Sequence, residues 1–186
     1  MKIYIKNMVC SRCIMAVQTI LEKAGIKVKT IHLGEVETNN ELSEIELKNL
    51  ATKLNAMGFE ILEDQSQKLI ENIKILIINK VSTLDISEDF LFSEYLSTQL
   101  HRDYSAISKL FSRHQGMTLE HYFILQKIEK VKELLFYQEY SLKEIAAMLG
   151  YKSVQHLSSQ FRNITGFTPT LFKNMKVKNR KPLDTF

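Results

Sequence analysis

The 186-residue sequence has no tryptophan, only two cysteines, two prolines and six glycines. Two cysteines three positions apart cannot make the disulfide framework of a small extracellular protein, so we expect a reducing, cytoplasmic location. The scarcity of proline and glycine excludes a fibrous or proline-rich disordered chain. No run of about eighteen apolar residues occurs, which argues against a membrane span. The N-terminus also lacks the long apolar core of a secretory signal.

Catalytic motifs are missing too. The sequence shows no nucleophile elbow, no phosphate-binding glycine loop and no paired carboxylates, and its five histidines are scattered without ligand or catalytic spacing. We therefore predict that the protein is not an enzyme.

Charge is distributed unevenly along the chain. Residues 1–66 carry 8 basic and 9 acidic side chains, residues 67–100 carry 3 and 5, and residues 101–186 carry 14 and 7. A basic C-terminal part attached to a slightly acidic remainder favours a polyanionic partner. A solvated basic face without function would give the same charge pattern.

Strand-like and helix-like patterns alternate over the first sixty residues. Period-two alternation indicates strands, whereas apolar residues three and four positions apart indicate helices. The expected elements are a strand at 2–6, a helix from Ile14 to Gly25, strands at 28–33 and 35–37, a helix between the Ser43/Glu46 capping box and Gly58, and a strand at 59–62. This βαββαβ order predicts a ferredoxin-like domain over residues 1–63.

The remainder of the chain has a helical pattern. Residues 64–68 are polar and lack periodicity, so we predict a linker there. Apolar residues at helical spacing then predict a helix from Leu69 to Val81, and no convincing strand follows. The expected fold class is α+β, in which a ferredoxin-like domain precedes an all-α domain.

The C-terminal half repeats itself at an offset of 50 residues. The matched pairs are Ile107 with Leu157, Phe111 with Phe161, Gly116 with Gly166, Thr118 with Thr168, and Tyr122 with Phe172. Five matches of the same chemistry indicate two related supersecondary units.

Each repeat has the pattern of a helix, a tight turn and a second helix. The first unit spans helices at 90–100 and 104–114. The second begins at the Ser141/Glu144 capping box, turns at Gly150, and continues in a helix capped by Ser153. A helix over 119–137 joins the two units. Its length of about 28 Å would hold them roughly one DNA turn apart.

These residues resemble the DNA-binding domain of the arabinose-regulator (AraC) family. The resemblance covers residues 69–176 and is carried by the Phe111 and Gly116 pair of the first unit and by residues of the second, which are Gly150, Tyr151, Ser153, Leu157, Phe161, Gly166 and Pro169. It implies a sequence-specific transcription regulator that binds double-stranded DNA through two helix-turn-helix units, followed by a basic tail at 177–186. Lys127 departs from the arginine common in this family and lacks the forked donor of a guanidinium group.

The face of each second helix opposite its apolar stripe is the candidate DNA-binding surface. It includes Tyr104 in the first unit, and Ser153 and His156 in the second. The resemblance implies base-reading roles for Ser105, Ser108, Lys109, Gln155, Ser158 and Ser159, and phosphate contacts for Arg113, Arg162 and Lys176. An exposed polar helix face without function is the alternative for any single one of these residues.

Met8, Cys10 and Cys13 follow the first predicted strand. Two thiolates at this spacing can converge on one ion, and soft sulfur ligands select Cu(I) first and Zn(II) next. With the βαββαβ order, this loop resembles the heavy-metal-associated domain of copper chaperones and metal pumps. Asn7, where that family usually has glycine, and Arg12, where it has a small residue, are departures.

Three roles for this N-terminal region remain open from the sequence: a metal sensor that uses Cys10 and Cys13, a relic domain that mediates homodimerisation, and a thiol–disulfide sensor. One chain lacks the four ligands of a zinc site, although two chains could supply four thiolates. The alternative to a regulator is a metal carrier or thiol-redox protein whose helical half serves only for docking.

Overall fold

The computed structural model describes residues 1–174, and the chain divides into two compact units after Ile75. Helix α3 (Gln65–Ser82) begins in the N-terminal unit and ends in the C-terminal unit. A small antiparallel sheet in the first unit and helices alone in the described part of the second confirm the expected α+β class. No helix within residues 1–174 is long and apolar enough to cross a membrane.

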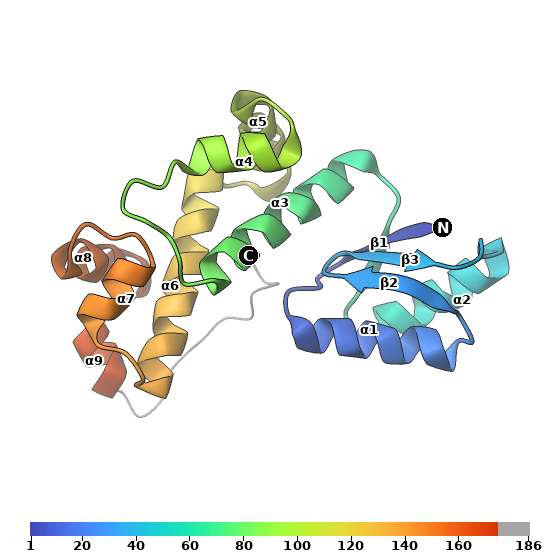
Figure 1. Ribbon diagram of the computed structural model, residues 1–186, viewed down its shortest axis with the longest axis horizontal. Helices are drawn as coiled ribbons and strands as arrows, with labels where there is room; N and C mark the ends of the chain where they lie inside the picture. Colours follow the sequence, from blue (N-terminus) through green and yellow to red (C-terminus); the bar gives the residue numbers. More distant parts are fainter. Residues whose placement is uncertain (175–186) are drawn as a thin grey trace. The chain divides into compact units, whose positions relative to one another are not determined.

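The N-terminal unit is a four-stranded antiparallel sheet with two helices on one face (Figure 1). Its elements are β1 (Lys2–Lys6), α1 (Ser11–Lys23), β2 (Val28–His32), β3 (Glu35–Thr38), α2 (Glu44–Asn55) and β4 (Glu60–Leu62). The strands lie in the order β2-β3-β1-β4. Alternate residues of β1, Ile3 and Ile5, are buried in the same core as Leu21 of α1 and Leu54 of α2. This inward alternation is what the period-two pattern predicted.

Two sequence predictions for this unit were wrong in detail. Met57, which the helix predicted up to Gly58 would include, lies beyond the end of α2 and is 62% exposed. The predicted linker at 64–68 is mostly helical, because α3 already begins at Gln65. Asp64 explains the early start: its Oδ1 accepts a hydrogen bond from the Gln67 amide at 2.9 Å and satisfies a donor that the first helical turn leaves free.

The C-terminal unit continues with six helices over residues 92–174. They are α4 (Phe92–Leu100), α5 (Tyr104–Gln115), α6 (Leu119–Tyr137), α7 (Leu142–Met148), α8 (Val154–Thr165) and α9 (Pro169–Asn174). The linking helix has the bounds expected from the sequence, whereas α4 begins at Phe92 and not at residue 90. Figure 1 shows α6 running past both helix pairs, α4–α5 near one end and α7–α8 towards the other.

The fifty-residue repeat is present in three dimensions. Phe111 of α5 meets Tyr122 of α6 edge to face, with ring centroids 5.4 Å apart. Phe161 of α8 meets Phe172 of α9 in the same way at 5.5 Å. All four rings are buried. Each second helix is therefore anchored to the helix that follows it by the same aromatic contact, which burial and ring geometry both favour.

The turn between α7 and α8 depends on Gly150, which has a φ of +66°. A Cβ atom at this position would lie 2.7 Å from the carbonyl oxygen of Ser87 and 2.8 Å from Cγ2 of Ile86. The backbone approaches this closely because the Ile86 amide donates to the carbonyl of Met148 at 3.1 Å. Glycine is required here by both conformation and space.

Lys127 of α6 is a charged residue in the interior of the C-terminal unit. It is only 8% exposed, and its Nζ lies 3.8 Å from the centre of the Tyr151 ring and 5.4 Å from that of Phe123. Burial lowers the pKa of the Lys127 ammonium to about 8, because removal from water disfavours the charged form.

Replacement of Gly150 by alanine should strongly destabilise the C-terminal unit. We expect Gly150→Ala to lower the free energy of unfolding by about 2–4 kcal/mol, since it adds a clash with fixed backbone to a left-handed conformation. Gly166→Ala is the matched control: its φ is +81°, but no atom lies within 4 Å of the added Cβ. That control should lose only about 1–2 kcal/mol. Urea unfolding measures both, and equal losses would show that the close contact is unimportant.

The lowered pKa of Lys127 gives the folded state a specific pH dependence. Between pH 8 and 10.5 the unfolded chain keeps a proton that the folded chain has lost, so stability rises with pH. We expect the wild-type protein to gain up to about 3 kcal/mol over this range relative to Lys127→Arg, which stays charged. Urea unfolding at a series of pH values measures the difference, and a difference independent of pH would contradict burial of an ionisable lysine.

Candidate nucleic-acid interface

Helix α5 separates an apolar face from a polar one. Ile107 and Phe111 are buried, whereas Ser105, Lys109 and Arg113 are exposed at successive intervals of four residues. Residues four apart lie on the same side of a helix, so these three form one stripe about 12 Å long. The helix contains no acidic residue. Ser108, also expected at this surface, is half-buried beside the stripe.

Helix α8 presents a similar stripe. Leu157 and Phe161 are buried, and Gln155, Ser159 and Arg162 are exposed along the opposite side. No acidic residue occurs in this helix either. Because α5 and α8 occupy equivalent positions in the repeat, the structure provides two comparable polar faces, each free of carboxylates.

Three other predicted interface residues of the second unit are partly engaged within the protein. Ser153 is the N-cap of α8, and its Oγ accepts from the His156 amide at 3.1 Å. The exposed His156 ring lies edge-on to Tyr151, with centroids 5.4 Å apart. Ser158 is half-buried. Gln155 and Ser159 therefore remain the most accessible candidates for base contacts on α8.

Tyr104, at the first position of α5, has a structural partner. Its hydroxyl donates to Oε1 of Glu120 on α6, and its ring meets Phe92 edge-on. Burial raises the pKa of the Tyr104 hydroxyl, and the bond to Glu120 raises it further. This residue fixes the start of α5 on α6, so a contact with DNA would have to use the exposed part of its ring.

One basic residue next to α5, Arg102, was not predicted from the sequence as part of this interface. Arg102 lies in the turn two residues before α5, and Lys152 lies two residues before α8. Both side chains are exposed. The offset of 50 that revealed the repeat also pairs these two residues, so the signal was available. Lys176 lies outside the described residues, but Lys173 at the end of α9 is exposed.

The two cysteines of the N-terminal unit lie close together. Cys10 is the N-cap of α1, and its Sγ is 3.6 Å from Sγ of Cys13 in the first turn. Both are free thiols and partly exposed. Burial raises the pKa of the Cys13 thiol. The N-terminus of a helix favours the thiolate form, but desolvation outweighs that effect at Cys13.

The residues around this loop have structural roles. Met8 is fully buried in the core and is no ligand. Asn7 adopts a φ of +71°, a conformation that asparagine tolerates better than most residues. It donates from Nδ2 to the carbonyl of Gly58 and from its amide to Glu71. Within residues 1–174, no three His, Cys, Asp or Glu side chains converge on a metal-sized site.

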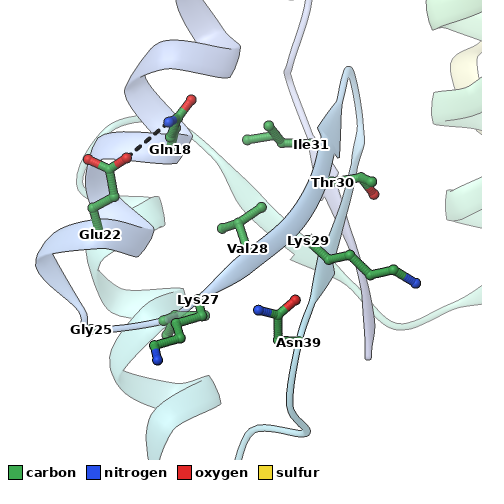
Figure 2. Close-up of a pocket in the computed structure, with 10 residues that line it drawn as sticks. Gln18, Glu22, Gly25, Lys27, Val28, Lys29, Thr30, Ile31 and Asn39 are labelled. Carbon is green, nitrogen blue, oxygen red and sulfur yellow. Dashed lines mark hydrogen bonds between the residues drawn. The ribbon is translucent and has the colours of Figure 1, made fainter.

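A cavity of about 670 Å³ opens between α1 and the edge strand β2 (Figure 2). Two lysines, Lys27 and Lys29, line it, but Lys29 is paired with Glu37 at 2.9 Å. Gln18 donates to Glu22 across the rim. The charged residues of its wall are exposed. The wall of the cavity also contains the apolar Ile26, Val28 and Ile31, and none of these contacts points to a particular ligand.

The family comparison agrees with the helical part of this description. A family model described as a helix-turn-helix domain matches residues 96–175, which include α5, α6, α7 and α8. In a comparison of folds, the C-terminal domain of AraT, a response regulator from Geobacillus stearothermophilus, has a TM-score of 0.52 with 19% identity. The match covers 62% of this chain and 92% of that domain. At this identity the likeness concerns the fold alone.

Two curated relatives are similar in sequence. An uncharacterised HTH-type transcriptional regulator of Bacillus subtilis, YtdP, is 25% identical over 155 residues, which are 78% of this chain and 20% of that protein. A probable transcriptional regulator of Photobacterium leiognathi, LumQ, is 22% identical over 107 residues, 58% of this chain and 43% of that protein. The chain thus spans less than half the length of either relative. Residues 96–175 of the helical unit thus match the model of a helix-turn-helix domain.

Proposed function

We propose that this protein is a sequence-specific transcription regulator that binds double-stranded DNA through α5 and α8. The observation that carries the proposal is the pair of equivalent helices, each with a buried aromatic face and an exposed, carboxylate-free face. A chance polar surface would be expected to mix charges of both signs. The helix-turn-helix family match over residues 96–175 supports the same function.

The chemistry of the two stripes suits a DNA groove. A major groove about 12 Å wide admits one α-helix, whose diameter with side chains is about 10–12 Å. Gln155 can bind adenine through two hydrogen bonds, and Lys109 can donate to guanine. Arg113, Arg162, Arg102 and Lys152 would hold the phosphate backbone on either side. Each helix would thus both read bases and fix the position of the protein on the DNA.

Variants of α8 should separate these two roles. We expect Gln155→Ala to lose about 5- to 100-fold in affinity for the preferred duplex but little for unrelated duplexes, since a base contact contributes only to the correct sequence. Arg162→Ala should weaken all duplexes alike and reduce the slope of log K against log salt by about 1. Fluorescence anisotropy with duplexes selected from a randomised library provides the affinities.

The exposed Lys143 on α7 offers a control of the same charge outside both stripes. Lys143→Ala should leave sequence preference unchanged. Wild-type binding that is insensitive to salt, or equal for all sequences, would contradict the proposed function.

A second proposal concerns the N-terminal unit, which we infer to be a ferredoxin-like domain that binds a thiophilic metal ion. The strand order β2-β3-β1-β4 with two helices on one face supports the fold assignment. The 3.6 Å approach of the Cys10 and Cys13 sulfurs supports the site. As the regulatory input, the ion would supply a signal that the helix-turn-helix domain lacks.

The donor set favours one kind of ion. Two thiolates suit Cu(I), which accepts few, soft ligands. A tetrahedral zinc site needs four ligands, so Zn(II) would require the cysteines of two chains and hence a homodimer. The buried Met8 leaves the sulfur pair as the ligands that this chain offers.

Metal titration tests this second proposal directly. We expect the wild-type protein to bind one Cu(I) per chain in competition with a colorimetric chelator, and Cys10→Ser/Cys13→Ser to bind none at the same free concentration. For Zn(II), half an equivalent per chain together with dimer formation would indicate a shared four-thiolate site. Equal, negligible binding of both metals by both proteins would exclude metal sensing through these cysteines, while leaving DNA binding unaffected.

A further inference from the structure

A continuous series of ring contacts connects the two candidate recognition helices. Tyr104 of α5 meets Phe92 of α4 at 6.3 Å, and Phe92 stacks on Phe123 of α6 at 4.5 Å with an interplanar angle of 6°. Lys127 of α6 then bridges Phe123 and Tyr151. Tyr151 meets His156 of α8 at 5.4 Å. We call these six residues the ring ladder.

The two central members of the ring ladder lie on one side of α6. Phe123 and Lys127 are four residues apart, so their side chains lie on the same face of that helix about 6 Å apart along its axis. Phe123 contacts the first helix pair through Phe92, and Lys127 contacts the second through Tyr151. The two pairs are thus held at neighbouring points of one rigid element.

Lys127 is the member of the ring ladder that joins the two halves. Its ammonium lies 3.8 Å from the Tyr151 ring centre, well within the range of a cation–π interaction, and the site is buried. Tyr151 is in turn held through its hydroxyl, which donates to Gln160 of α8 at 2.7 Å. A change at Lys127 would therefore be transmitted to the whole of α8 through a ring that is fixed at both ends.

We propose that the ring ladder sets the relative orientation of α5 and α8, and that Lys127 is a positioning residue that allows both helices to bind one duplex at the same time. The proposal rests on the DNA-binding function given above. If one helix pair could tilt freely on α6, binding of the first half-site would leave the second helix disordered relative to its groove. Pre-organisation reduces that entropic cost.

Two-site and one-site duplexes distinguish positioning from folding. The probes are the tightest 30-base-pair duplex that the full-length wild-type protein selects from a randomised library, the same duplex with one or two base pairs inserted at its centre, and fragments that each keep one half-site. We expect Lys127→Met to bind the intact duplex about 5- to 30-fold more weakly, the loss that corresponds to a desolvated cation–π contact. Binding to the fragments should change by less than about 2-fold. The loss of affinity caused by inserted base pairs should be smaller for Lys127→Met than for the wild-type protein.

Two further variants serve as controls. Lys127→Arg keeps the cation and should restore binding of the intact duplex to within about 3-fold of wild type. Lys130→Met removes the same charge one turn away on α6, where Lys130 pairs with Glu133 at 2.7 Å outside the ring ladder, and should resemble wild type. Equal losses on the intact duplex and on the fragments, or no loss on either, would overturn the positioning role.

A measurement without DNA keeps the proposal separate from the proposed function. Methylene protons next to the Lys127 ammonium should show upfield ring-current shifts in the NMR spectrum of the free protein. Tyr151→Leu should remove most of this shift and leave only the smaller contribution of the more distant Phe123 ring. If these shifts are missing, the ring ladder is wrong whatever the protein binds. If they are present but the wild-type protein selects no duplex, DNA binding fails, and the positioning role fails with it.

Discussion

The burial of α6 is the constraint on which the rest of the C-terminal unit depends. Tyr122 near its start lies under α5, while Val131 and Leu135 further along belong to the core that holds α7, α8 and α9. A helix covered on several sides cannot be moved without exposing aromatic and aliphatic surface, and each large side chain of this kind contributes on the order of 2–3 kcal/mol. The two helix pairs take their positions from this one helix. Their polar faces point outward because their apolar faces are committed to it.

The same constraint explains why a lysine is retained in the interior. An isolated buried ammonium is unfavourable, and the lowered pKa of Lys127 expresses that cost. Lysine offers a flexible stem with a compact charge that can lie between the Phe123 ring of its own helix and the Tyr151 ring of the turn between α7 and α8. A purely apolar residue would fill the space without the directional attraction to Tyr151. The buried charge makes the core less stable, but its contact with Tyr151 defines the relative orientation of the two helix pairs.

In the N-terminal unit, the conformation of the loop before α1 places the two thiols. Met8 is buried in the core on one side of the loop, and Asn7 is held by its contacts with Gly58 and Glu71 on the other. Next to these anchors, Cys10 at the N-cap of α1 and Cys13 in its first turn remain partly exposed and close to each other. Burial raises the pKa of the Cys13 thiol, so an ion bound by this sulfur would have to displace its proton.

The sequence by itself determined the elements that depend on local chemistry. The Ser43/Glu46 and Ser141/Glu144 capping boxes, the helix-ending glycines and the fifty-residue repeat specified most helix bounds, because caps and periodicity act between residues close in the chain. The prediction of a linker at 64–68 was wrong, because Asp64 caps a helix whose apolar face begins only later. Only the tertiary structure could show that Tyr104 is bound to Glu120, that Gly150 lies against Ser87, and that Lys127 lies against the Tyr151 ring. These contacts join residues 16 to 63 positions apart or groups on separate helices, and no local pattern encodes such encounters: they arise where buried surfaces meet.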